Sequence, residues 1–447
     1  MKFDKEKDKL EKMNNEKLYG QQTQSAIENF NLKNKKTNME LIFAIVTVKK
    51  AVAKTYIKLD INKEIYLAID KACDEILQGK YNDNFVVEAL QGGAGTSTNM
   101  NVNEVIASVA SSILGKDIHD NSVIHPLDDV NKGQSTNDVY PTALRIACIK
   151  QLRILSDECA KLQESLQRKE QEFADIEKIG RTQLMDAVKI TLGEEFGAYA
   201  QCIARDRWRI YKIEERLRQV NIGGTAIGNC LNANRQYMFE VMEQLRQLTG
   251  MGLAKAEYPI DITQNNDVFV EVSGLLKALA VNLSKIAGDL RLMNSGPNGG
   301  IGEIRLKPMQ MGSTIMPGKV NPVIPEMVME VSMKVMANDY AITMASSRGE
   351  FELNAFLPLI ADCILENLSL LINCVKIFRE KCIDVLKANE ERCRENLDKT
   401  YWFATEYVPI LGYDVVADEI KNNCVEDNET LKNRLKQMVK DNEINNN

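Results

Sequence analysis

The stretch Met311-Gly312-Ser313-Thr314-Ile315-Met316-Pro317-Gly318-Lys319-Val320-Asn321-Pro322 organises this chain, because it leads from a glycine-bounded loop into a helix predicted from Val323 to about Asp339. Asn321 suits the N-cap of that helix and Pro322 suits its first turn. A helix N-terminus presents unpaired N–H groups and the positive end of the helix dipole, so this one, beside Lys319, suits a carboxylate or a phosphate. With Gly312 and Gly318 as hinges, we expect a mobile loop. Taken alone, the stretch favours an ordinary helix-capping loop.

Two other segments have the same character. Gly95-Thr96-Ser97-Thr98-Asn99 precedes a helix predicted from about Met100 to Leu114, and Gln134-Ser135-Thr136-Asn137 precedes another helix. A nucleotide-binding P-loop is disfavoured for the first segment, because it lacks the Gly-Lys-Ser/Thr ending and no convincing strand comes before it. One such segment would be a helix cap. The repeated Ser-Thr-Asn triplet, together with the Ser313 loop, predicts hydroxyl-bearing helix ends that converge on one anionic ligand.

The rest of the chain predicts long helices. No proline occurs between Thr142 and Tyr258, and the apolar residues there recur at helical spacing. We expect breaks at Gly180–Gln183 and at Asn221–Gly224, a further helix from about Asn265 to Met293, and a kink at Pro358 in the helix that follows. Alternation typical of strands is nearly absent. The predicted fold class is therefore mainly all-α, built on a long-helix bundle.

Composition narrows the class of protein. Of the 447 residues, 44% are hydrophobic and 27% are charged, and the net charge of -7 argues against a general nucleic-acid binder. No apolar run approaches ~18 residues, so we expect no membrane span. Met1 to Lys17 is charged and lacks the apolar core of a secretory signal. The ten cysteines form no Cys-x-x-Cys pair, which indicates reduced core thiols and a cytoplasmic protein. With only His119 and His125, a multi-histidine metal site is hard to build.

Four blocks in order resemble the aspartase/fumarase superfamily, over nearly the whole chain from Tyr19-Gly20 onward. They are Gly95–Glu104, Gln134–Asp138, Gly180–Ala187 and Gly312–Pro322. The resemblance implies a three-domain helical protomer with an N-terminal domain (1–135), a central bundle (136–390) and a small C-terminal helical domain (391–447). It also implies a homotetramer with a multi-helix core, in which three subunits share each active site. A small dicarboxylate substrate is implied, with no cofactor, no nucleic acid and no membrane partner; activation by a divalent metal is not readable from sequence.

Members of this superfamily eliminate a proton and a leaving group from a C4 dicarboxylate unit and give fumarate. Gln183 stands where fumarases usually carry histidine, and Thr136 stands where they tend to carry serine. Thr263-Gln264-Asn265 points the same way. We therefore expect ammonia-lyase activity on L-aspartate. Fumarate hydratase activity and a non-catalytic structural role are the alternatives, and His125 is expected to be structural.

The resemblance assigns roles to single residues. Ser313 is the expected base, and because a serine hydroxyl is a poor base it needs a positive local field, for which Lys319 and nearby amides are the plausible source. Preorganised donors must stabilise the enediolate that forms when the β-proton leaves. The expected substrate-binding residues are Thr96, Ser135, Thr136, Asn137, Thr182, Gln183, Lys319 and Asn321. The chain departs from the family pattern at Ser25, Met185, Lys189, Thr314 and Asn229-Cys230, which puts affinity and activity level in question more than reaction class.

Overall fold

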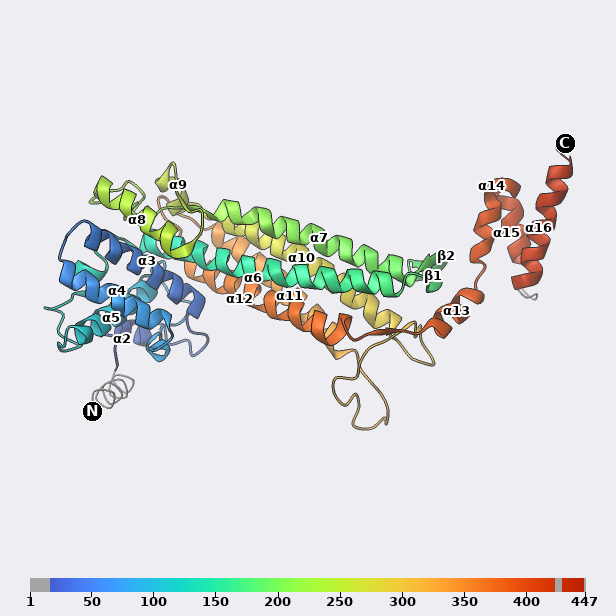
Figure 1. Cartoon of the computed structure of the whole chain (residues 1–447), viewed down its shortest axis with the longest axis horizontal. Coiled ribbons are helices and arrows are strands. Elements are labelled where there is room, and N and C mark those ends of the chain that lie inside the picture. Colours follow the sequence, from blue (N-terminus) through green and yellow to red (C-terminus); the bar gives the residue numbers. More distant parts are fainter. Residues whose placement is uncertain (1–16, 423–427, 446–447) are drawn as a thin grey trace. The chain divides into compact units, whose positions relative to one another are not determined.

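The computed structural model describes residues 17–422 and 428–445, and most of them are helical (Figure 1). The expected charged N-terminal arm lies almost wholly outside the described residues. The shorter helices toward the N-terminus are α2 (Gln21–Asn29), α3 (Met39–Lys58), α4 (Lys63–Leu77) and α5 (Thr96–Ile113). The long helices are α6 (Thr136–Glu172), α7 (Leu192–Leu217), α10 (Asp267–Met293), α11 (Val323–Ser346) and α12 (Leu357–Phe378). Between them lie α8 (Arg235–Thr249) and α9 (Pro259–Gln264), and the chain continues with α13 (Glu390–Asp398), α14 (Val408–Leu411), α15 (Tyr413–Asn422) and α16 (Asn428–Asn445).

Contacts divide the chain into two compact units. The first comprises Met1–Ser156, Trp208–Ala278 and Met333–Ile372; the second comprises Asp157–Arg207, Leu279–Ser332 and Asn373–Asn447. Each of the five long helices contributes residues to both units. The three-domain division by residue number stays a prediction.

The core of the first unit follows from the apolar faces of its helices. Asn38 accepts a hydrogen bond from the backbone N–H of Glu40 and so caps α3. Helix α5 is buried along nearly its whole length, polar residues included. Short helical turns complete the unit's loops: η1 (Asn82–Asn84), and η2 (Pro126–Val130), a π-helical turn. His125 accepts the N–H groups of Leu127 and Asp128 and caps η2, which is the structural role expected for it.

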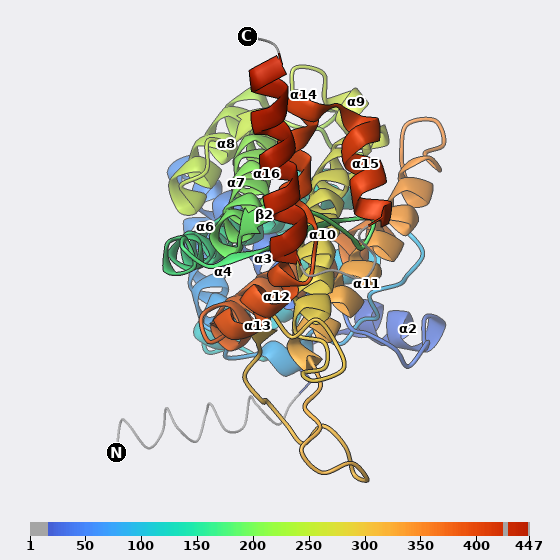
Figure 2. The same cartoon turned by 90° about the vertical axis from the view of Figure 1, so that its right-hand side faces the viewer.

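The second unit carries two small antiparallel sheets. Strands β1 (Glu177–Thr182) and β2 (Met185–Thr191) form a hairpin, and β5 (Ile304–Arg305) pairs with β6 (Lys387–Ala388). A parallel pair, β3 (Gln219–Val220) and β4 (Ala254–Lys255), belongs to the first unit. Between α10 and α11 the second unit has a long loop, drawn in gold in Figure 2. The turn η3 (Arg379–Ile383) precedes α13 in the chain, and the turn η4 (Trp402–Tyr407) follows it. The C-terminal helices have a small hydrophobic core of their own: Phe403, Ala404, Val416, Leu431 and Leu435.

Several sequence expectations need correction. Helix α5 begins at Thr96, not at Met100, because the turn made by Gly93–Gly95 ends there. Helix α11 starts at Val323 as expected but runs on to Ser346. Pro358 lies in the first turn of α12, where its missing N–H costs no hydrogen bond, so the expected kink is wrong. The break expected at Gly180–Gln183 exists, but it is a β-hairpin.

One helix bears on the expectation that the chain has no membrane span. Leu357–Ile383 is one continuous helical stretch, long and apolar enough to do so by length and composition, with a mean hydropathy of 1.5. However, 61% of the apolar 18-residue window within this stretch is buried inside the protein. Asp362 and Glu366 of the same helix both form ion pairs with Lys35 at 2.9 Å. It has the character of a core helix of a globular protein.

Candidate active site

The residues predicted to form the site fall into two groups. Thr96, Ser135, Thr136 and Asn137 belong to the first unit, at the N-termini of α5 and α6. The second unit holds the other five: Thr182, Gln183, Ser313, Lys319 and Asn321.

The first group is organised by hydrogen bonds that tie α5 to α6. The hydroxyl of Thr96 donates to the carbonyl of Gly93 at 2.7 Å, within the turn that begins α5. Gly95 has a φ of 94°, and a side chain there would overlap the ring of Tyr140 on α6. Asn99, one turn into α5, donates to the hydroxyl of Thr136 at 3.1 Å. The two helix starts that carry Ser-Thr-Asn triplets therefore meet, and their convergence with the Ser313 loop on one ligand stays a prediction.

Ser135 and Asn137 serve partly as caps. The hydroxyl of Ser135 accepts the N–H of Asn137 at 3.2 Å, and the side chain of Asn137 donates to the carbonyl of Ala226 at 2.7 Å. Asn221 returns a hydrogen bond of 3.0 Å to the carbonyl of Asn137. The Asn221–Gly224 break thus places its backbone against the start of α6.

Sequence reasoning missed a buried cation next to this group. Lys49 on α3 is 1% exposed, and its Nζ atom donates to Oδ1 of Asn131 at 2.7 Å. Asn99 and Asn103 donate to the same oxygen at 3.1 and 3.2 Å. Burial lowers the pKa of Lys49 to about 7, although the carboxyl of Asp138 opposes that shift. In the sequence, Lys49 is one of two lysines in the largely apolar segment Ile45–Val52. That pattern does not show which residue Lys49 contacts.

Asp138 is the anionic counterpart. It accepts the backbone N–H groups of Ser135 and Thr225 at 3.1 and 2.9 Å. Burial raises its pKa to about 7, against the effect of these hydrogen bonds and of Lys49. Two buried ionisable groups thus lie within the hydrogen-bond network that holds Ser135, Thr136 and Asn137.

In the second unit, Thr182 and Gln183 occupy the tip of the β1–β2 hairpin. Thr182 pairs with Met185, which leaves Gln183 and Leu184 as the two turn residues, with φ of 55° and 64°. Two successive positive φ values are typical of a type I′ turn, which costs energy for residues other than glycine. Leu184 and Met185 are 69% and 70% exposed. The tip therefore projects polar and apolar side chains together into solvent.

The Ser313 loop presents its hydroxyl to backbone amides. Oγ of Ser313 accepts the N–H groups of Met316 and Ile315 at 2.9 and 3.2 Å. Two such donors stabilise negative charge on this oxygen, which is what a serine base requires. The side-chain amide of Asn321 donates to the carbonyl of Gly312 at 2.7 Å. The side chain of Lys319, which lies between these two residues in the sequence, is exposed.

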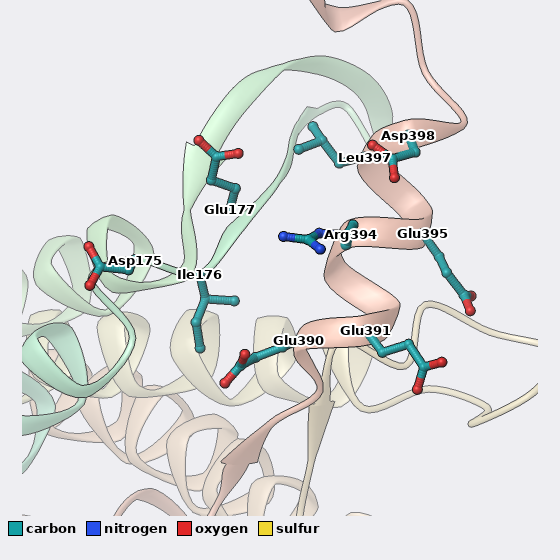
Figure 3. Close-up of a pocket in the computed structure, with 9 residues that line it drawn as sticks. All are labelled: Asp175, Ile176, Glu177, Glu390, Glu391, Arg394, Glu395, Leu397 and Asp398. Atoms are coloured by element: carbon teal, nitrogen blue, oxygen red, sulfur yellow. The ribbon is translucent and has the colours of Figure 1, made fainter. Parts of the chain in front are cut away.

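One pocket of about 650 Å³ holds none of these residues. It lies in the second unit between the start of β1 and α13 (Figure 3). Six carboxylates and one arginine line it, together with two apolar residues: Asp175, Ile176, Glu177, Glu390, Glu391, Arg394, Glu395, Leu397 and Asp398. Such a lining repels a dicarboxylate, so this pocket is not the substrate site. A smaller one of about 440 Å³ borders Gln183, Lys178 and Arg181. The described residues contain no group of three or more His, Cys, Asp or Glu side chains placed to hold a metal ion.

Known proteins resemble the chain closely. A family model described as "Lyase" matches residues 11–337. An aspartate ammonia-lyase of a Bacillus species is 45% identical over 400 residues, covering 89% of this chain and 86% of the relative. An aspartate ammonia-lyase of Helicobacter pylori is 41% identical over 90% of this chain and 86% of its own length.

Solved structures agree in fold. A "fumarate lyase:delta crystallin" from Brucella melitensis, solved with cobalt bound, superposes with a TM-score of 0.90 at 42% identity, covering 96% of this chain and 95% of its own. A class II fumarase from Schistosoma mansoni gives a TM-score of 0.88 at 32% identity, covering 91% of this chain and 89% of its own. The mainly helical fold predicted from the sequence is confirmed.

Proposed function

The chain belongs to the aspartase/fumarase superfamily of lyases, and on that premise we propose that it is an aspartate ammonia-lyase, a carbon–nitrogen lyase that converts L-aspartate reversibly to fumarate and ammonia. The Ser313 hydroxyl, with two backbone N–H groups aimed at its oxygen, is the single observation that best supports the chemistry. An oxygen placed in this way can take up a proton from carbon.

The reaction has two steps. Ser313 removes the proton from the carbon next to the side-chain carboxylate of aspartate, and the electron pair left behind delocalises into that carboxylate as an enediolate. The pair then returns to form the carbon–carbon double bond while the carbon–nitrogen bond breaks and ammonia leaves. The first step places two negative charges on one end of the substrate, so its barrier falls mainly through hydrogen-bond donors fixed beforehand. Thr96, Thr182 and Gln183 are the proposed donors.

The remaining residues hold the other end of the substrate. Lys319 and Asn321 are proposed to bind the α-carboxylate, with Ser135, Thr136 and Asn137 around that carboxylate and the amino group. Lys49 and Asn99 both donate to Asn131, and Asn99 also donates to Thr136, so the protonated form of Lys49 adds positive potential to this side of the site. No cofactor is part of the proposal.

Gln183 is the residue that favours ammonia-lyase activity over fumarate hydratase activity. A histidine at this position could form a charged pair with a glutamate, but a glutamine cannot. In fumarases, a glutamate at the position that matches Glu326 pairs with that histidine; here Glu326 lies 3.7 Å from Arg291. The deciding experiment measures fumarate formed from L-aspartate and, in parallel, from L-malate. Faster release from L-malate would replace this proposal with fumarate hydratase, and no release from either would favour a structural protein.

We further propose a homotetramer in which different subunits complete one active site. The exposed apolar residues Met333, Tyr340 and Met344 recur at helical spacing on α11 and support a contact with a second copy of the chain. Light scattering should give about four times the chain mass of 50.4 kDa. Mixing Ser313→Ala with a Thr182→Ala/Gln183→Ala double variant should restore some activity, because some sites would then receive both sets of intact residues. An active monomer would refute the shared site.

Cysteine usage supports a reducing compartment. Nine described cysteines are free, and seven of them are buried: Cys73, Cys148, Cys159, Cys363, Cys374, Cys382 and Cys393. We propose a cytoplasmic location on this basis, which fractionation of the native cells would test.

A further inference from the structure

Glu303 is a fully buried carboxylate with four hydrogen-bond donors around it. Its side chain is 0% exposed. Arg181 donates to both of its oxygens, at 2.8 and 3.1 Å, and Lys178 lies 3.0 Å from Oε2. Asn396 on α13 donates to Oε1 at 3.2 Å. A two-bond arginine–carboxylate pair fixes orientation as well as distance.

Three of these four donors, from Arg181 and Lys178, come from the strand that leads to the hairpin tip. Arg181 immediately precedes Thr182, and Lys178 lies earlier on β1. None of the described side chains from Thr182 to Met185 makes a hydrogen bond, and all four are exposed. Beyond the backbone pairing of the hairpin, the strained turn at Gln183 and Leu184 therefore has its nearest side-chain anchor in the Arg181–Glu303 pair.

The same carboxylate belongs to the stem of the Ser313 loop. Glu303 lies ten residues before Ser313, and its backbone N–H donates to the carbonyl of Met293, the last residue of α10. Helix α13 holds the neighbouring backbone, since Arg392 donates to the carbonyls of Gly300 and Ile301 at 3.0 and 3.2 Å. One buried side chain thus joins the hairpin, the loop stem and α13.

The charges around Glu303 indicate what removal of its carboxylate would change. Lys178 is 2% exposed, and its other anionic partner is Glu195, at 2.8 Å. Without Glu303, the buried Lys178 would keep one carboxylate and Arg181 would lose its ion pair. A partly buried guanidinium without a carboxylate partner is unfavourable, so the strand would move to let Arg181 regain one or reach water.

We propose that Glu303 is a positioning residue for the reaction: through Arg181 and Lys178 it fixes Thr182 and Gln183, at the hairpin tip, relative to the rest of their own protomer. This inference rests on the proposed roles of Thr182 and Gln183. It extends them, because no feature of the motifs assigns any function to Glu303.

The test compares Glu303→Gln with Asp206→Asn. Asp206 is also a buried carboxylate of the second unit, 1% exposed, and it accepts a hydrogen bond of 2.6 Å from Asn282. Both variants should lose stability. Only Glu303→Gln should lower kcat/KM for L-aspartate, by about 10–100-fold, because small displacements of positioned groups cost that much.

A double-mutant cycle separates positioning from general damage. If Glu303 acts through the tip, adding Gln183→Ala to Glu303→Gln should lower kcat/KM by clearly less than the product of the two single losses. Adding Gln183→Ala to Asp206→Asn should lower kcat/KM by the full product of the two single losses. Multiplicative losses in the Glu303 cycle would overturn the proposal.

A readout without turnover keeps this inference distinct from the proposed function. Hydrogen–deuterium exchange of the peptide covering residues 178–184 should speed up in Glu303→Gln and not in Asp206→Asn. If the wild type makes no fumarate, the proposed function fails, while the exchange experiment still decides whether Glu303 holds the hairpin. Equal exchange in the two variants would refute it.

If Glu303→Gln does not fold, Arg181→Lys serves as the second variant. It keeps the positive charge but not the two-bond geometry. Exchange of the 178–184 peptide should again speed up, by less than in Glu303→Gln, and the losses in kcat/KM on adding Gln183→Ala should again be less than multiplicative. Exchange as slow as in the wild type would then refute the proposal.

Discussion

The side-chain amide of Asn321 donates a hydrogen bond of 2.7 Å to the carbonyl oxygen of Gly312, and this contact closes the loop that carries Ser313. Within the closed loop, the oxygen of Ser313 accepts two backbone N–H groups. The side chain of Asn321, expected to cap α11, instead holds the two ends of the loop together. The loop is therefore shaped by its own ends before any substrate arrives.

We predict that Ser313→Ala lowers kcat for L-aspartate by ~10²–10⁴-fold, the usual contribution of a general base, while KM changes less. The reason is that the serine acts chiefly in the transition state. Thr314→Ala, at the exposed neighbouring hydroxyl, is the matched control and should keep most activity. Near-normal kcat in Ser313→Ala would move the search for the base to Thr136 or His125.

Lys319→Ala should raise KM strongly as well as lower kcat, because this exposed cation would bind the substrate carboxylate already in the ground state. Lys307→Ala removes another exposed lysine from the same segment and controls for the change in net charge. Steady-state kinetics on both variants decide the matter. An unchanged KM in Lys319→Ala would exclude the lysine from substrate binding.

Gly312→Ala should impair activity more than stability. A methyl group at this position would overlap the carbonyl oxygen of Lys319, so the loop ends would have to separate. Gly299→Ala is the matched control, since a methyl group there meets nothing within 4 Å. Thermal unfolding should show two similar proteins, and the fumarate assay should distinguish them. Equal activity would mean that closure of the loop base is not required.

Stability should depend on pH through Glu303. Burial alone would raise the pKa of Glu303, but the hydrogen bond from Arg181 and the charge of Lys178 outweigh it and hold the pKa below its ordinary value of 4.5. The unfolded chain then binds a proton at this carboxyl at a higher pH than the folded protein does. The ionised group contributes stability that is fully present above about pH 4.5 and is lost as the pH falls through the folded-state pKa.

Urea unfolding of the wild type and Glu303→Gln measures this contribution. The wild type should be the more stable protein at about pH 7, and the difference in free energy of unfolding should narrow toward about pH 4. Asp206→Asn shows how large an effect any buried carboxylate produces. A difference that stays constant or widens in acid would contradict the assigned direction of the pKa.

Local rules predicted much of the helical fold. Helix α11 begins at Val323 as predicted, and the glycine segment before Thr96 does precede a helix, although α5 begins four residues earlier than predicted. The hairpin was missed because β1 has no apolar alternation. Lys178 and Arg181 would be solvent-facing charges in most sequences, and here they are held by a carboxylate more than a hundred residues away.

The sequence by itself determined the long helices, their breaks and the family's polar blocks, because helical periodicity, capping and turn residues act over short distances along the chain. Tertiary structure decided which charges are buried. Lys49 against Asn131, and Glu303 against Lys178 and Arg181, are pairs whose members lie far apart in sequence. Burial of a charge depends on everything packed around it, and no local pattern encodes that. The positions of Thr136 and of the Thr182–Gln183 tip depend on those buried charges.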